Sequence, residues 1–310
     1  MIAPETVLNE VKKAVVGKDE VIAMAFIAII ARGHILIEDI PGVGKTTMAL
    51  AFSKALGLEY RRVQFTPDVL PSDIVGFSLL DKQTGEMVYK PGAILCNLFL
   101  ADELNRATSR TQSALLEAME EGRVTVDSVT HPVPDPFVVI ATQNPAGSSG
   151  TQLLPESQLD RFMVRLTLGY PDPADELDLL ARKQKGNPLD RVNCVATSSD
   201  LAAMRAEAEG VFVDKKIFDY AIRLSTASRN NRYVYHGASP RASIAVISMA
   251  KAAAWLCGRD YVIPEDVKFI YAATITHRLL LTAEAKAAGK TQQGVLEEIL
   301  AATPAPVSRK

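Results

Sequence analysis

The residues best suited to chemistry lie in a short loop between an apolar run, 34–40, and a helical pattern. Such a glycine-containing loop turns its backbone N–H groups toward an anion at the start of the next helix. The Lys45 ammonium can reach β- and γ-phosphate oxygens, and the Thr46 hydroxyl can ligate Mg²⁺. The stretch predicts a phosphate-binding P-loop, against the alternative of a glycine-rich turn before a core helix. Its predicted nucleotide-binding residues are Pro41, Gly42, Val43, Gly44, Lys45, Thr46 and Thr47.

One position departs from the strict P-loop pattern, because Asp39 stands where a glycine is usual. That position lies at the end of the preceding strand, farthest from the phosphates. A residue with a side chain is tolerable there if its backbone conformation is ordinary. We therefore expect Asp39 to have φ below zero and to make no direct phosphate contact.

A pair of carboxylates, Asp102 and Glu103, follows a mostly apolar run at 94–101. Such a run is typical of a strand buried on both faces of a parallel sheet, and α/β sheets bind ligands at the carboxyl ends of their strands. Asp102 would hold Mg²⁺ directly or through its waters, and Glu103 would polarise the attacking water. An acidic pair at a strand end is often only a solvated turn, but its position after a P-loop favours a Walker B motif.

A third apolar run, 137–142, ends in Gln143, Asn144 and Pro145. A polar side chain at the tip of a strand beside Walker B can reach a γ-phosphate or the water that attacks it. We assign this sensing role to Asn144. By itself the dipeptide Asn144-Pro145 would not indicate a site, since Asn-Pro is also common in turns.

Five motifs then follow one another in a fixed order. They are GVGKT at 42–46, ADELNRA at 101–107, ATQNP at 141–145, LPESQLDRF at 154–162 and GASPRA at 237–242. Together with VQFTPDVLPSD at 63–73, they closely resemble the MoxR family of AAA+ ATPases, from about Val15 to about Pro306. The resemblance implies a parallel-sheet P-loop core, an α-helical lid, ATP and Mg²⁺ as cofactors, and a homo-oligomeric ring, expected to be a hexamer. It also implies chaperone-like action on a client, with a partner that carries a von Willebrand factor A domain.

The resemblance assigns further roles, residue by residue. Arg161 matches the arginine finger that reaches the γ-phosphate of the adjacent subunit, and Arg241 matches sensor 2 on the lid. Val16 and Gly17 match the segment that packs on adenine. A guanidinium suits charge that develops on a transferring phosphoryl group, although either arginine could instead form a surface ion pair, Arg161 with Asp160. Other candidates for the trans contact are Arg106, Arg110 and Arg165.

Composition narrows the classes of partner. The 310 residues carry 34 Lys+Arg against 36 Asp+Glu, a net charge of −2 with no basic tail, which disfavours a nucleic acid partner. The most apolar stretch, 21–31, is too short to span a bilayer, so we expect no membrane insertion. Three isolated cysteines fit a reducing compartment, and we expect a cytoplasmic protein. The four histidines show no metal-binding spacing.

Prolines around 171–173 mark a boundary between an α/β domain, 1–170, and a mostly helical lid domain, 171–310. Two hairpins are expected in the first domain, pairing 77–80 with 86–89 and lying within 123–130. In the family these correspond to the helix-2 insert and the pre-sensor 1 hairpin, which would face the ring pore. The expected helices are two within 5–32, and others at 45–56, 107–121, 174–184, 198–209, 214–228, 240–257, 264–280 and 290–302.

The expected function is ATP hydrolysis that drives chaperone-like remodelling or activation of a protein partner. A helicase is disfavoured because Arg123 is the only Lys or Arg between 121 and 131, and no aromatic–apolar–Gly loop of a threading unfoldase is obvious. Two alternatives stay open. One is a motor subunit of a magnesium-chelatase-like complex, and the other is a slow nucleotide-gated binding module.

Overall fold

The computed structural model describes residues 2–144 and 154–306, so Pro145 of the sensing motif lies outside the described residues. The chain forms two compact units that interleave along the sequence. Unit 1 comprises Met1–Ala23, His34–Arg161 and Leu166–Ala202, and unit 2 comprises Met24–Gly33, Phe162–Arg165 and Ala203–Lys310. The units come from the packing of the chain, and the domain boundary expected between residues 170 and 171 stays a prediction.

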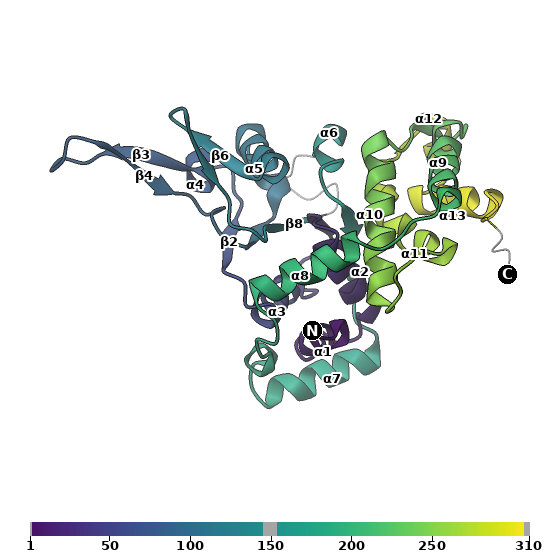
Figure 1. Ribbon diagram of the computed structural model, residues 1–310, viewed down its shortest axis with the longest axis horizontal. Coiled ribbons are helices and arrows are strands. Elements are labelled where there is room, and N and C mark those ends of the chain that lie inside the picture. Colours follow the sequence, from purple (N-terminus) through teal and green to yellow (C-terminus); the bar gives the residue numbers. More distant parts are fainter. Residues whose placement is uncertain (1, 145–153, 307–310) are drawn as a thin grey trace. The chain divides into compact units, whose positions relative to one another are not determined.

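A five-stranded sheet has four of its strands in unit 1, and its fifth strand begins in unit 2 and ends in unit 1 (Figure 1). Its order is β2 (Tyr60–Gln64), β5 (Leu98–Asp102), β8 (Val138–Gln143), β1 (Ile35–Glu38) and β9 (Val164–Leu166). The pairs β2–β5, β5–β8 and β8–β1 are all parallel, which confirms the α/β parallel-sheet fold. Every residue of β5 and β8 is buried, which explains why these two strands read as continuous apolar runs.

The parallel register decides where the site lies. Gln64 is paired with Asp102 across β2 and β5, and Glu38 is paired with Gln143 across β1 and β8. The last residues of four strands therefore lie along one edge of the sheet, and the segments that follow them start from that edge.

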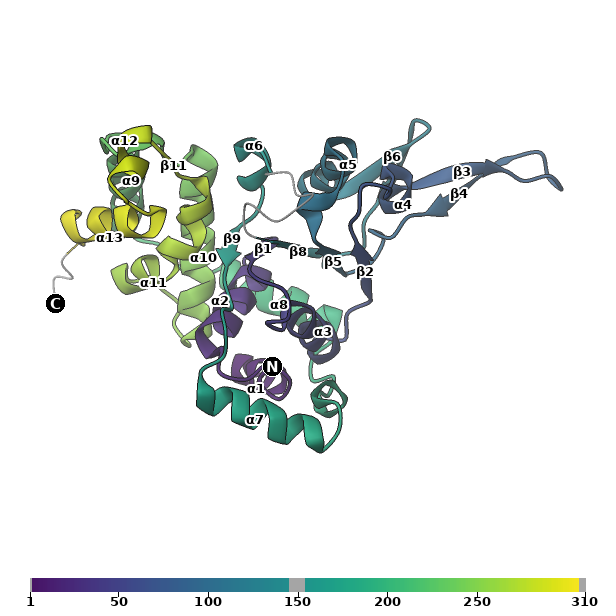
Figure 2. The same cartoon turned by 180° about the vertical axis from the view of Figure 1, so that it is seen from behind.

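Unit 1 contains the first of the two helices expected within 5–32 and those expected at 45–56, 107–121 and 174–184, together with two short helices that were not predicted. They are α1 (Pro4–Lys12), α3 (Lys45–Ala55), α4 (Pro71–Val75), α5 (Ser109–Glu121), α6 (Glu156–Leu159) and α7 (Pro173–Gln184), with 3₁₀ turns at Leu104–Arg106 and Pro188–Arg191. Thr108 caps the start of α5 by accepting a hydrogen bond from the Thr111 N–H, and Gly122 ends it with φ of 64°. Side by side in Figures 1 and 2, α1 and α7 are joined where Arg182 donates hydrogen bonds to the carbonyl oxygens of Lys12 and Lys13.

Both expected hairpins are present in unit 1. They are β3 (Gly76–Leu80) with β4 (Met87–Pro91), and β6 (Arg123–Val126) with β7 (Val129–Pro132), and both extend away from the sheet in Figures 1 and 2. The Tyr89 and His131 rings stack at 3.7 Å between centroids, which joins the two hairpins. The outer part of the first hairpin exposes apolar side chains, among them Leu80 and Met87.

Unit 2 is built mainly of helices (Figure 2). They are α9 (Lys215–Arg229), α10 (Pro240–Leu256), α11 (Pro264–Ile275), α12 (Ala283–Ala287) and α13 (Gln292–Ala302), with a 3₁₀ turn at Thr276–Arg278 and a pair of short strands, β10 (Val234–His236) and β11 (Leu280–Leu281). Two further helices, α2 (Asp19–Ile30) and α8 (Ser198–Glu209), begin in unit 1 and end in unit 2. Alanines let α10 pack closely on α11, and Tyr220 and Tyr271 fill the core.

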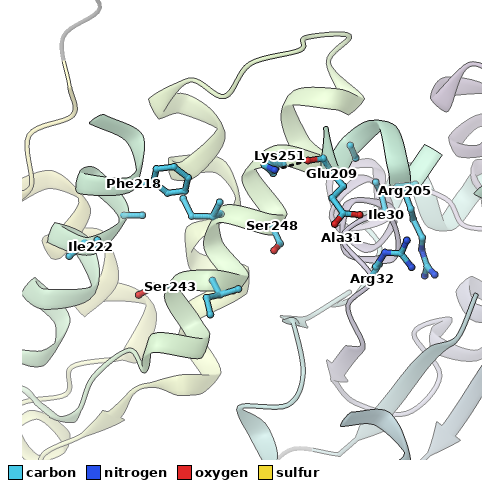
Figure 3. A pocket seen from close by; sticks show the side chains of 14 residues that line it. Ile30, Ala31, Arg32, Arg205, Glu209, Phe218, Ile222, Ser243, Ser248 and Lys251 are labelled. Carbon is cyan, nitrogen blue, oxygen red and sulfur yellow. Dashed lines mark hydrogen bonds between the residues drawn. The ribbon is translucent and has the colours of Figure 1, made fainter. Parts of the chain in front are cut away.

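Unit 2 also contains a groove of about 530 Å³ (Figure 3). Phe218 and Ile222 of α9 give it an apolar wall, while Arg205 of α8 and Lys251 of α10 add cationic side chains. Both cations already hold backbone carbonyls, since Arg205 Nε donates to the Ile29 oxygen and Lys251 Nζ to the Glu209 oxygen.

Several element boundaries differ from the sequence prediction. The Walker B strand begins at Leu98 instead of Ile94, because the Asn97 side chain bonds the Pro136 oxygen and the Glu59 N–H and holds the preceding segment in a bend. The helix expected over 264–280 ends at Ile275, where the chain turns so that the buried His277 ring reaches the Phe162 oxygen. The short elements that were not predicted are α4, α6, β9, α12, β10 and β11.

Candidate nucleotide and metal site

The loop after β1 has the backbone of an anion cradle. Gly42 and Gly44 have φ of 89° and 98°, a left-handed conformation that glycine adopts without strain. Gly44 is the N-cap of α3, so its loop directs the first free N–H groups of that helix into the same space. A Cβ atom on either glycine would meet no protein atom within 4 Å, so the space over the loop is open for a ligand.

Lys45 is buried at the start of α3, and its Nζ donates to the backbone oxygen of Asp39 at 2.6 Å. Burial lowers the pKa of the Lys45 ammonium, while the nearby carboxylates of Asp39, Asp102 and Glu103 act in the opposite direction. The ammonium is thus held at the mouth of the loop, where a phosphate would supply a further compensating negative charge.

Asp39, which stands where the P-loop pattern usually has glycine, stabilises the structure around the loop. Asp39 is not among the described residues with positive φ, which confirms the expected conformation. Its buried carboxylate accepts hydrogen bonds from the N–H groups of Ile40 at 2.8 Å, Leu168 at 2.7 Å and Gly169 at 2.6 Å. Asp39 therefore ties the segment after β9 to the end of β1. That it makes no phosphate contact stays a prediction.

Asp102 is buried at the end of β5, with both carboxylate oxygens engaged. The Thr142 hydroxyl donates to Oδ1 at 2.6 Å. The Arg62 guanidinium donates to Oδ2, from Nη2 at 2.6 Å and from Nε at 3.2 Å. The sequence prediction had not included Arg62, which the register of β2 against β5 brings beside the carboxylate.

Glu103, which follows Asp102 in the chain, has a left-handed backbone conformation with φ of 55° and ψ of 46°. This conformation is strained for a residue with a side chain and persists because other contacts fix it. The Glu103 N–H donates to the Thr142 hydroxyl at 2.9 Å, and the carboxylate accepts from Arg106 Nη1 at 2.9 Å. Asn144 Nδ2 is 3.5 Å from the other carboxylate oxygen, so the expected sensing residue and the expected water-polarising residue face one another.

These groups surround one cavity of about 360 Å³. Its lining contains Arg62, Gln64 and most of the predicted residues, namely Pro41, Gly42, Gly44, Lys45, Thr46, Thr47, Asp102, Glu103 and Asn144. Thr46 and Asp102 offer the oxygen ligands that Mg²⁺ prefers, and the loop offers backbone N–H groups for phosphate. The residues present therefore fit a nucleotide with its magnesium ion.

A second cavity, of about 380 Å³, shares Gly42, Gly44 and Thr47 with the first. Predicted residues Val16 and Val43 line it together with a set of residues that sequence reasoning missed: Leu179, Leu180, Lys183, Asn187, Pro188 and Leu189. Gly17 beside it has φ of 67°, and a Cβ there would overlap the Asp175 carboxylate. The apolar lining fits a purine base, and the adjacent Leu179 and Leu180 of α7 were the available signal in the sequence.

Arg161 lies apart from the P-loop cavity. Its Nη1 donates to the Leu116 oxygen at 3.0 Å, and its guanidinium forms an ion pair with Glu120 of α5. With Glu120 and Gln158 it lines a third cavity of about 340 Å³, none of whose lining residues belongs to the P-loop cavity.

The other arginines are dispersed. Arg241 is exposed in the first turn of α10, and Arg165 donates to the Gln292 side chain, both in unit 2. Arg110 is exposed on α5. The roles of these residues at a nucleotide stay predictions.

Comparison with known proteins gives a consistent result. Residues 34–164 match the ATPase family associated with various cellular activities (AAA), and residues 226–299 match the AAA lid domain. The chain is 44% identical over 302 residues to YeaC of Bacillus subtilis, which covers 97% of this chain and 94% of YeaC. It is 36% identical over 311 residues to Chaperone MoxR1 of Mycobacterium tuberculosis, which covers 97% of this chain and 82% of MoxR1.

A solved structure agrees with these relatives. The crystal structure of a proposed ATPase from Cytophaga hutchinsonii is 38% identical and superposes with a TM-score of 0.90, over 98% of this chain and 94% of that one. The fold is thus that of a P-loop AAA+ protein with a C-terminal helical lid. Similarity of this extent shows that the chain belongs to the MoxR family of AAA+ ATPases.

Proposed function

We propose that this ATPase hydrolyses ATP in a Mg²⁺-dependent reaction at the 360 Å³ cavity of unit 1. The observation that carries the proposal is the convergence of Lys45, Asp102 and Glu103 on that one cavity, at the edge where the parallel strands end. Phosphoryl transfer needs positioning and charge stabilisation more than covalent chemistry, and these groups supply both.

Each residue has a definite task in this proposal. The amides of the P-loop and the Lys45 ammonium bind the β- and γ-phosphates, while Thr46 and Asp102 hold the metal, which neutralises phosphate charge when bound. Glu103 polarises the attacking water, and Asn144, facing Glu103, orients that water or the γ-phosphate. Val16 and Gly17 position the base, and Arg161 and Arg241 add positive charge in the assembled site.

The output of the cycle is proposed to be chaperone-like remodelling or activation of a protein partner. The relative from Mycobacterium tuberculosis carries the name of a chaperone, and AAA+ proteins commonly form rings. We propose a homo-oligomeric ring of six subunits, an adaptor with a von Willebrand factor A domain, a cytoplasmic location and no nucleic acid partner. None of the described helices is long and apolar enough to cross a lipid bilayer.

The decisive experiment separates nucleotide binding from turnover. Glu103→Gln should bind ATP with nearly unchanged affinity and lose at least about 100-fold in turnover, because only the polarisation of water is removed. Lys45→Ala should weaken ATP binding itself. Calorimetric titration and phosphate release, at subunit concentrations that form rings, measure the two effects.

Glu59→Gln is the matched control, because Glu59 is an exposed carboxylate paired with Arg61 outside the cavity lining. It should leave both quantities unchanged. Turnover by Glu103→Gln at the wild-type rate would show that another carboxylate activates the water. A wild-type ring that binds ATP without releasing phosphate would indicate the nucleotide-gated binding module instead.

A further inference from the structure

Strand β2 carries two consecutive arginines that serve different purposes. Successive side chains of a strand point to opposite faces. Arg61 bonds the Glu59 carboxylate at 2.9 Å and the Gly92 backbone oxygen at 3.2 Å. Arg62 bonds Asp102 and lines the P-loop cavity, which Arg61 does not.

Arg62 is the positively charged group in direct contact with Asp102. The Asp102 side chain is only 10% exposed, and a carboxylate so buried is costly unless a cation or hydrogen-bond donors compensate it. Thr142 compensates Oδ1 with a neutral hydroxyl, and Arg62 is the cation that bonds Oδ2 directly. The Lys45 ammonium also acts on this carboxylate, through space. A divalent ion is the other cation suited to a carboxylate in this position.

The surroundings of the Arg62 guanidinium allow it to dissociate from the Asp102 carboxylate. The Arg62 side chain is 44% exposed, in contrast to the carboxylate that it contacts. Its Nη2 also donates to the Gln64 Oε1 at 3.0 Å, and Gln64 lines the same cavity. The guanidinium can therefore release Asp102, keep a partner on its own strand and still face the cavity, while the Thr142 hydrogen bond keeps the carboxylate oriented.

We propose that Arg62 is a built-in counter-cation that competes with the divalent metal for Asp102. In the nucleotide-free protein the guanidinium neutralises the carboxylate. Binding of a metal–nucleotide complex displaces it from Oδ2, and the freed guanidinium turns to the phosphate oxygens that enter beside Lys45 and Thr46. This proposal rests on the nucleotide site proposed above and assigns Arg62 as a positioning residue within it.

The test uses Mn²⁺ as the metal probe and ADP as the nucleotide, with the full chain. Free Mn²⁺ is counted by electron paramagnetic resonance at saturating ADP, which requires no turnover. Arg62→Gln should lower the apparent Kd for Mn²⁺ roughly 3- to 10-fold, because the competing charge is gone and the lost ion pair is partly exposed. Arg62→Lys, which keeps the charge but loses the forked geometry, should fall between Arg62→Gln and wild type.

Two further readouts distinguish competition from damage to the fold. Binding of ADP in excess EDTA should weaken in Arg62→Gln, because the Asp102 carboxylate then faces the phosphates without its neutralising cation. The melting temperature of Arg62→Gln should fall in EDTA, where Asp102 has lost its charged partner, and recover when Mn²⁺ and ADP are added. Arg61→Gln, the control on the opposite face of β2, should leave the Mn²⁺ affinity at its wild-type value.

The outcomes are separable. If wild type binds neither ADP nor Mn²⁺–ADP, the nucleotide site itself is wrong. A second outcome is that wild type binds Mn²⁺–ADP, but Arg62→Gln and Arg62→Lys bind Mn²⁺ no more tightly than wild type does. In that case Arg62 does not compete with the metal for Asp102, and the proposed nucleotide site stands. Equal tightening in Arg61→Gln would show a general effect of net charge and would also overturn the proposal.

Discussion

The Asp39 carboxylate accepts hydrogen bonds from two backbone N–H groups that lie 129 and 130 positions later in the chain. Both of these donors, on Leu168 and Gly169, follow β9, and the cavity that fits a purine base lies partly on the segment beyond them. The residue that departs from the P-loop pattern therefore stabilises the wall around the nucleotide and leaves phosphate binding to its neighbours.

Asp39→Gly should lower the free energy of unfolding by roughly 2–4 kcal/mol, because buried N–H groups lose their acceptor and a glycine is introduced. Affinity for ATP should change by no more than a few-fold, since the carboxylate is not expected to contact phosphate. Urea unfolding and calorimetric titration measure these quantities. Asp68→Gly, at an exposed position, is the control. A large gain in ATP affinity would mean that Asp39 had been repelling phosphate.

Some site residues could be read from the sequence and others could not. Lys45, Thr46 and Asp102 belong to local motifs in which a few neighbouring residues define the chemistry. Arg62 reaches Asp102 only because β2 pairs with β5 in one register, and 40 residues separate the two. A single sequence contains no local signal for that register, so such a partner appears only once the sheet is assembled.

Among the elements, the 3₁₀ turn Thr276–Arg278 places a titratable ring inside unit 2. His277 is buried, with Nε2 at 3.0 Å from the Phe162 oxygen. Burial, and secondly the charge of Arg278, hold the pKa of His277 well below its usual value, although the bond to Phe162 acts in the opposite direction. The folded protein thus keeps the ring neutral under conditions in which the unfolded chain would protonate it.

Stability should therefore fall as pH decreases below about 6.5, by up to about 1.4 kcal/mol per pH unit from this residue alone. The sign follows because the unfolded state binds the additional proton. His277→Gln keeps an N–H donor but does not titrate, so its unfolding midpoint in urea should lose less between pH 7.5 and pH 5 than that of wild type. His236→Gln, at an exposed position, should retain the wild-type slope. Parallel slopes for His277→Gln and wild type would assign the loss to other groups.

The long elements were predictable because their periodicity is local. The α5 helix has a capping threonine, an apolar face and a terminal glycine, all within its own sequence. The three residues of β9 and the two of β11 are too short for a pattern to be distinguished, and their partners lie far away in the chain. Strand β5 begins later than its apolar run predicts, because the Asn97 side chain forms hydrogen bonds to two segments that are distant in the chain. The apolar run itself contains no sign of these bonds.

In the proposed ring, we expect Arg161 to act on a neighbouring subunit. Within its own chain it pairs with Glu120 and lines a cavity separate from that of the P-loop. Rings that mix Arg161→Ala and Glu103→Gln subunits should therefore recover part of the phosphate release that each mutant lacks. At some interfaces one subunit supplies an intact Glu103 and the other an intact Arg161, which rebuilds a complete site.

The control mixes Glu103→Gln with Arg123→Ala, a change in an exposed arginine paired with Glu121. The Arg123→Ala protein should be active by itself. Activity of this control mixture therefore shows the effect of diluting active subunits with inactive ones, whereas recovery in the first mixture requires complementation. Specific activity of wild type should also rise with concentration as rings form, because the proposed ring places the nucleotide at a subunit interface. Flat activity on dilution to monomers, or no recovery in rings shown to be mixed, would count against action in trans.

The chain that leaves Glu103 returns to the same point at Asn144. Between them it builds α5 and the β6–β7 hairpin, and its two ends are joined where Asn105 Nδ2 donates to the Asn144 oxygen at 3.1 Å. The Tyr89–His131 stack adds the other hairpin to this closed loop. In mechanical terms this segment is a closed linkage whose two ends meet beside the cavity. We therefore expect a rotation of the Glu103 backbone to move both hairpins together, with α5 as the rigid element between them.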